Sequence, residues 1–149
     1  MLYTFSLNPI DFTDLKVVFQ SRTEYKLGDD VKQAVQSCRD YLDKKLDGNN
    51  HAYYGINTGF GALYDKSISA EDLGQLQVNL MMSHACGMGE EVPDEIVQLM
   101  IFLKIRGLSY GKSGVQLATV QLLVDFLNHG ILPVVYQQGS LGASGDLSP

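Results

Sequence analysis

The sequence has no tryptophan and only two cysteines among its 149 residues. Cys38 and Cys86 form neither a disulfide framework nor the close spacing of a metal site, which favours a reducing compartment. Basic residues are scarce: 11 stand against 17 acidic ones, and the net charge of -6 disfavours nucleic acid and anionic membranes as partners. The sequence also lacks a long apolar run and a basic, signal-like start. We therefore expect a cytoplasmic protein that binds no metal, nucleic acid or membrane.

The sequence does contain a strong helical pattern. Apolar residues make up 45% of the chain, which suffices for one domain with a core. Their spacing predicts an amphipathic helix over residues 29–46. Further helices are expected from Ser69, from Pro93 and over residues 115–127, and the last two are apolar on nearly all sides. The predicted fold class is therefore mainly α.

Three other segments lack a clear helical pattern. Residues 51–68 are rich in Gly, Asn and Tyr, and a long loop of this kind in a compact domain is usually functional. Near the N-terminus, we expect the apolar residues between Phe5 and Ile10 to pair as a strand with residues 17–19. Residues 107–113 resemble the phosphate-binding pattern G-x-x-x-x-G-K-[ST], but one residue is missing and helices flank them. A turn between two helices is expected there instead.

The C-terminal stretch, residues 139–149, reads Gly-Ser-Leu-Gly-Ala-Ser-Gly-Asp-Leu-Ser-Pro. Its glycines permit tight turns that other residues rarely adopt. A sharp bend can bring the amide nitrogen of Gly145 onto the carbonyl carbon of Ala143, and loss of one water then closes a five-membered ring. Loss of the Ser144 hydroxyl as a second water leaves an exocyclic methylene. The product is a strong electrophile made from the backbone, although most Ser and Gly clusters mark ordinary turns.

Three blocks of the sequence, in the same order, resemble the aromatic amino acid ammonia-lyase family. Residues 139–149 match the family pattern G-S-[VL]-G-A-S-G-D-L-[AS]-P without a gap. Residues 54–61 match its Tyr-Gly-Ile-Asn-Thr-Gly-Phe-Gly block, and residues 79–89 match the block that contains Ser-His-Ala-Cys-Gly. The Ser-His pair within this last block resembles the histidine-selective members. Three ordered blocks across most of the chain make the resemblance specific.

The resemblance implies a cofactor and a set of catalytic residues. In this family, a triplet equivalent to Ala143-Ser144-Gly145 becomes 4-methylidene-imidazol-5-one (MIO), without any bound metal or nucleotide. The family counterpart of Asp146 assists the cyclisation. Tyr54 occupies the position of the proposed general base, which removes a proton from the carbon beside the aromatic ring. Either the substrate amine or the aromatic ring attacks the methylene, and the family leaves both schemes open.

The resemblance also implies a substrate. His84 lies where relatives vary with substrate, and we expect it to bind the ring of L-histidine, since an imidazole can exchange a hydrogen bond with another imidazole. Gly61 is expected to bind substrate as well. The implied reaction is the non-oxidative elimination of ammonia from L-histidine to give urocanate.

The resemblance finally implies that residues 1–149 are an N-terminal portion of a larger all-α lyase. Residues 1–110 would form the substrate loop and helices, and residues 111–149 the first helix of a central bundle plus the MIO loop. The family assembles as homotetramers, so we expect the isolated fragment to be inactive.

Some positions depart from the family pattern. Relatives carry P-x-[KR] where this chain has residues 136–138, and they favour Asn and Arg where it has Arg106 and Gln116. These departures keep a tyrosine or phenylalanine ammonia-lyase or an aminomutase open as alternatives. A non-catalytic helical domain that serves only assembly is a further alternative.

Overall fold

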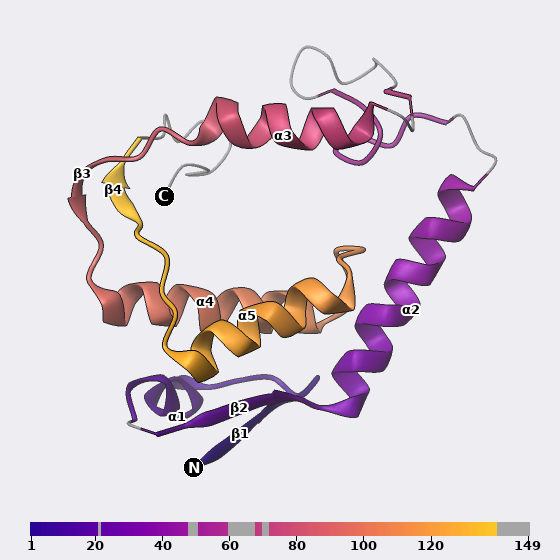
Figure 1. Cartoon of the computed structure of the whole chain (residues 1–149). Coiled ribbons are helices and arrows are strands. Elements are labelled where there is room, and N and C mark those ends of the chain that lie inside the picture. Colours follow the sequence, from indigo (N-terminus) through magenta and orange to yellow (C-terminus); the bar gives the residue numbers. More distant parts are fainter. Residues whose placement is uncertain (21, 48–50, 60–67, 70–71, 140–149) are drawn as a thin grey trace. The chain divides into compact units, whose positions relative to one another are not determined.

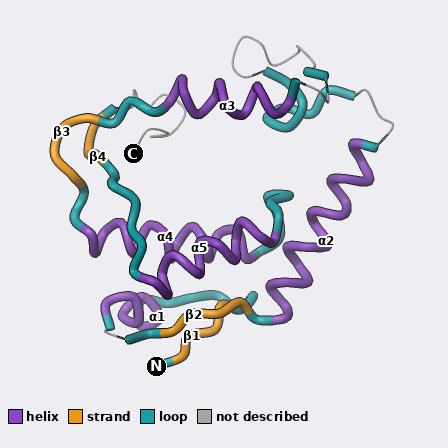
Figure 2. Tube along the Cα trace, viewed as in Figure 1, coloured by secondary structure: helices purple, strands orange, loops and turns teal. Residues whose placement is uncertain are grey.

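The computed structural model describes residues 1–20, 22–47, 51–59, 68–69 and 72–139. Helices predominate among these residues, as Figure 2 shows, so the predicted fold class is confirmed. The chain divides into two compact units. The first contains Met1–Lys44 and Glu91–Val135, and the second contains the described residues of 45–90 and those from Tyr136 onward. No helix among the described residues is both long and apolar enough to span a membrane.

The first unit begins with two short parallel strands. Strand β1 (Leu2–Phe5) pairs with β2 (Glu24–Leu27) in the register Phe5 to Leu27. A short helix α1 (Phe12–Leu15) and a 3-10 helix η1 (Lys16–Phe19) connect the strands. Asp11 caps α1, because its Oδ1 accepts hydrogen bonds from the Thr13 and Asp14 amides at 2.7 and 3.1 Å. The expected pairing of residues 5–10 with 17–19 is therefore wrong.

Residues 17–19 form a 3-10 helix and not a strand, and the reason lies in which of their side chains are buried. Val17 and Val18 are both buried, but they reach the core from consecutive positions of a 3-10 turn. In a strand, consecutive side chains would point to opposite faces. The alternation that does mark a strand lies further on, in Glu-Tyr-Lys-Leu, where Tyr25 and Leu27 are buried and Glu24 and Lys26 are exposed.

Two antiparallel helices cover this pair of strands. Helices α4 (Asp94–Ser109) and α5 (Leu117–His129) pack along each other in the first unit (Figure 1). Phe102 of α4 is fully buried, and its ring lies 5.1 Å from that of Phe5 and 5.3 Å from that of Tyr3, centroid to centroid. The buried hydrophobic residues come from the two strands, η1 and the longer helices of the unit: Phe5, Val17, Val18, Tyr25, Leu27, Val31, Val35, Val97, Ile101, Phe102, Ile105, Val120, Val124 and Leu127.

Polar contacts fasten the strands to the helices. The Asn128 side chain, at the end of α5, accepts from the Tyr25 amide at 2.7 Å and donates to the Tyr25 carbonyl at 2.9 Å. Arg106 of α4 is 3% exposed, and it donates to the Ser6 carbonyl and, at 3.1 Å, to the Tyr110 hydroxyl. The bonds to Tyr25 and Ser6 pair backbone groups in and beside the strands.

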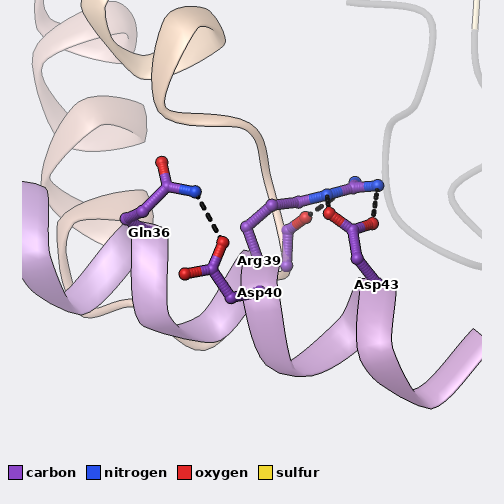
Figure 3. A network of polar contacts seen from close by, with 5 residues as sticks. Gln36, Arg39, Asp40 and Asp43 are labelled. Carbon is purple, nitrogen blue, oxygen red and sulfur yellow. Dashed lines mark hydrogen bonds and ion pairs between the residues drawn. The ribbon is translucent and has the colours of Figure 1, made fainter.

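The predicted helix over residues 29–46 is α2 (Asp29–Leu46). Figure 3 shows pairs of side chains spaced four residues apart along it. Gln36 donates to Asp40 at 2.7 Å, and Arg39 forms an ion pair with Asp43. Arg39 also donates to the carbonyl of Gly114 at 3.2 Å, so this helix is tied to the turn between α4 and α5.

That turn is the one expected in place of a phosphate-binding loop. Helix α4 continues through Gly107 to Ser109, and the left-handed backbone of Gly111 follows, with a φ of 61°. The expected helices from Pro93 and over residues 115–127 are α4 and α5. The division of function at residue 110 stays a prediction.

The second unit contains helix α3 (Leu73–His84) and a two-stranded sheet of β4 (Tyr136–Gln138) and β3 (Met88–Glu91), of which only Glu91 belongs to the first unit. The predicted helix was expected to open at Ser69, but α3 begins four residues later. Ser69 instead forms a turn with Asp72, accepting from its amide at 3.2 Å and donating to its carboxylate at 2.7 Å. None of the residues in α3 is buried.

Candidate functional site

Two of the predicted site residues, Tyr54 and His84, lie among the described residues, both in the second unit. The other five lie outside the described residues: Gly61, Ala143, Ser144, Gly145 and Asp146.

Tyr54 lies in a turn that the side chain of Asn57 holds together. The Asn57 Oδ1 accepts from the Tyr53 amide at 2.7 Å, and its Nδ2 donates to the His51 carbonyl at 3.0 Å. Gly55 follows Tyr54 with a φ of 75°, a left-handed conformation that favours glycine. This turn presents the Tyr54 side chain outward, and the residue is 64% exposed.

Thr58 anchors the same turn from inside. It is fully buried, and its hydroxyl donates to the Gly59 carbonyl at 2.9 Å and lies 3.4 Å from the Gly55 amide as an acceptor. The backbone carbonyl of Asn57 accepts from the amide of Ile68 at 2.8 Å. The Asn-Thr pair inside the Tyr-Gly-Ile-Asn-Thr-Gly block therefore has a structural role, because it holds residues on both sides of Tyr54.

His84 is the last residue of α3 and is partly buried. Its Nδ1 lies 3.0 Å from the Leu80 carbonyl oxygen and 2.8 Å from the Ser83 hydroxyl. The imidazole is therefore held against the end of its own helix.

Cys86 links this region to the start of the glycine-rich stretch. The residue was expected to be a packing residue, but it is exposed, and its thiol donates to the carbonyl of Gly139 at 3.0 Å. Gly139 has a φ of 133°, in the region that favours glycine. The thiol thus connects the segment after His84 with the residue that begins the Gly-Ser-Leu-Gly-Ala-Ser-Gly run.

The β3–β4 sheet strengthens the same connection. A Cβ added to Gly87 would lie 2.9 Å from the Tyr136 ring, and one added to Gly89 would lie 3.3 Å from the Gln138 side chain. Tyr136 and Gln138 are positions at which this chain departs from the pattern of its relatives, and both pack here on glycines. The structure thereby brings the end of the His84 helix beside the approach to the triplet.

The described part of the chain has no group of three His, Cys, Asp or Glu side chains that could hold a metal ion. Sequence reasoning missed the contributions of Asn57, Ser83 and the Cys86 thiol. All three lie inside or directly beside the blocks that carry the resemblance, so their position was the available signal.

Comparison with known proteins assigns the family. A family model described as "Aromatic amino acid lyase" matches residues 10–149. The chain belongs to the aromatic amino acid lyase family. A relative named histidine ammonia-lyase, from Caldanaerobacter subterraneus subsp. tengcongensis, is 39% identical over 142 residues, which cover 95% of this chain and 28% of the relative.

Solved structures of aromatic amino acid lyase family members share the fold. Histidine ammonia-lyase from Trypanosoma cruzi superposes with a TM-score of 0.84 at 29% identity, covering 99% of this chain and 29% of that one. Ergothionase from Treponema denticola, described as an ergothioneine-degrading enzyme, gives a TM-score of 0.89 at 26% identity, covering 99% of this chain and 29% of that one. The chain thus spans less than a third of the length of these relatives.

Proposed function

We propose that this chain is the N-terminal portion of an ammonia-lyase that eliminates ammonia from L-histidine to give urocanate. The observation that carries the proposal is the 39% identity to a histidine ammonia-lyase across 95% of this chain. The Ser-His pair at the end of α3 supports histidine within the aromatic amino acid lyase family. The complete enzyme is a cytoplasmic homotetramer in this proposal, and residues 1–149 alone are inactive.

The residues present are of the kind that MIO requires. Ala143 supplies a small flank, Ser144 supplies a hydroxyl that leaves as water, and Gly145 supplies an unhindered nitrogen. Asp146 follows this triplet. The left-handed backbone of Gly139 and the bond from Cys86 to its carbonyl support a fixed conformation of the chain just before the triplet. Once formed, the group supplies an electrophile that accepts electron density from the substrate during elimination.

The chain's own side chains have separate tasks in this reaction. Tyr54 takes the proton from the carbon beside the substrate ring, acting as a general base. A phenol ordinarily titrates near pH 10, so this role requires neighbouring donors or positive charge. Tyr54 is 64% exposed here, and we propose that the remainder of the enzyme covers it and supplies those groups.

His84 binds the imidazole of the substrate in this proposal. A buried site that hydrogen-bonds a polar ring rejects an apolar ring of the same size, since its own polar group would then be left unpaired. Gly61 contributes to the same substrate-binding site.

The test is a product analysis of the full-length protein. Purified enzyme is incubated separately with L-histidine, L-tyrosine and L-phenylalanine, and products are followed by absorbance and by chromatography of amino acids. Urocanate and ammonia in equal amounts, formed preferentially from L-histidine, are the expected result. A β-amino acid product would identify an aminomutase, and preferential formation of coumarate or cinnamate would identify the other lyases. Absence of any product would favour an assembly domain.

A further inference from the structure

The contacts of the His84 ring decide which of its nitrogens carries the proton. The Ser83 hydroxyl donates to the Leu80 carbonyl at 2.8 Å, which uses its single proton. The His84 Nδ1 lies 3.0 Å from the same carbonyl oxygen and 2.8 Å from the Ser83 oxygen.

Only one proton arrangement satisfies all three contacts. A carbonyl oxygen can only accept, so Nδ1 must carry a hydrogen to bond with it. The Ser83 oxygen, having donated its proton, keeps lone pairs and accepts from the same N–H. The opposite tautomer would place the lone pair of Nδ1 against the carbonyl lone pairs at 3.0 Å. The neutral imidazole therefore carries its proton on Nδ1, and Nε2 can only accept.

A second histidine in the chain shows what Ser83 adds. The His129 Nδ1 lies 2.8 Å from the carbonyl of Asp125, the same spacing along the end of α5. Its preceding residue, Asn128, bonds instead to the backbone of Tyr25 through both side-chain polar atoms. Both rings thus contact the carbonyl four residues earlier. The His84 ring has, in addition, the Ser83 hydroxyl oxygen as an acceptor beside its Nδ1.

We propose that Ser83 is a positioning residue that keeps the His84 proton on Nδ1, so that Nε2 presents an acceptor to a substrate ring carrying an N–H donor. The inference rests on the proposed function and specifies its substrate class. L-Histidine offers such an N–H. 3-(3-Pyridyl)-L-alanine has a ring nitrogen that can only accept a hydrogen bond. That nitrogen and the His84 Nε2 would then be two acceptors facing each other, so the site disfavours this substrate.

The first experiment compares three forms of the full-length enzyme: wild type, Ser83→Ala and Ser83→Thr. The measured quantity is the ratio of kcat/KM for L-histidine to kcat/KM for 3-(3-pyridyl)-L-alanine. One neutral hydrogen bond shifts a tautomer equilibrium by about twofold to about tenfold, so Ser83→Ala lowers the ratio by that factor. Ser83→Thr keeps a hydroxyl that can bond back to the helix carbonyl, and the ratio stays at the wild-type value. Ser83 is exposed and lies one residue before the end of α3, so neither substitution disturbs buried packing and both variants fold.

The second experiment reads the proton directly. ¹⁵N-Histidine-labelled enzyme is studied by solid-state NMR at about pH 9, above the range in which histidine side chains ordinarily titrate. The His84 signals are assigned by their loss in His84→Gln. The wild type and Ser83→Thr show a protonated Nδ1, and Ser83→Ala gains population with the proton on Nε2.

The outcomes separate this inference from the function on which it rests. An unchanged substrate ratio in Ser83→Ala, in an enzyme that deaminates histidine, overturns the inference alone. A wild-type proton on Nε2 overturns it whether or not the enzyme is active. Absence of histidine deamination in the wild type overturns the proposed function, and the NMR result still decides the role of Ser83.

Discussion

Gly111, in the turn between α4 and α5, is a position where the fold leaves no room for a side chain. Its φ of 61° is left-handed, and an added Cβ would lie 2.4 Å from the carbonyl oxygen and 2.6 Å from the carbonyl carbon of Ala34. Both atoms belong to the backbone of α2, so no rotamer change can relieve the contact. The left-handed backbone costs about 1–2 kcal/mol for alanine, and shifting packed elements apart costs about 1–3 kcal/mol. We expect Gly111→Ala to destabilise the protein by about 2–5 kcal/mol in total.

Gly107 provides the matched control in the same segment. It lies inside α4, and no atom comes within 4 Å of an added Cβ. Replacing a helical glycine by alanine in open space is favourable by up to about 1 kcal/mol. Thermal unfolding of the full-length variants, followed by circular dichroism at one scan rate, gives the comparison. The expected order of Tm is Gly107→Ala, at or above wild type, and Gly111→Ala several degrees below. Equal Tm values for the two variants would refute the packing of α2 against this turn.

Three further substitutions test the site and the core of the first unit. Tyr54→Phe is expected to lower kcat/KM for L-histidine by about 10²–10⁴ with an unchanged circular dichroism spectrum, and a loss below tenfold would assign the residue to packing. His84→Leu is expected to lower the ratio of histidine to phenylalanine turnover, because the substrate imidazole loses its polar partner; an unchanged ratio would show that His84 does not contact the ring. Burial raises the pKa of the Tyr25 phenol in the folded protein, so the protonated phenol stabilises the fold below about pH 10, where a phenol ordinarily titrates. This stabilisation is lost as the pH rises through the raised pKa of the folded state. Tyr25→Phe is therefore expected to lose less stability than wild type in unfolding curves above pH 10, and identical alkaline slopes would contradict this.

The longer helices could be predicted from the sequence because their signals are local. The apolar spacing and the turn after residue 46 define α2, and Pro93 with the acids that follow defines the start of α4. The parallel pairing of β1 with β2 could not be predicted in the same way. It depends on Phe102 and Asn128, which contact the strands from helices far along the chain.

The candidate site could likewise be predicted only in part from the sequence. Tyr54 and His84 could be named because each lies in a block shared with relatives. The bond from Cys86 to Gly139 spans 53 positions, and only the pairing of β3 with β4 shows that these residues meet. The proton on His84 likewise depends on side-chain geometry at the helix end, which residue identity alone does not specify.

The electrophile itself offers the most direct test of the central claim. Intact mass spectrometry of the full-length protein is compared with the mass calculated from its sequence, alongside the Ser144→Ala variant, and near-ultraviolet absorbance is recorded for both. The wild type is expected to be lighter than calculated by two water molecules and to absorb in the near ultraviolet. Ser144→Ala is expected to lack the methylene, the absorbance and turnover. A wild-type mass equal to the calculated value, or wild-type turnover in Ser144→Ala, would contradict the central claim.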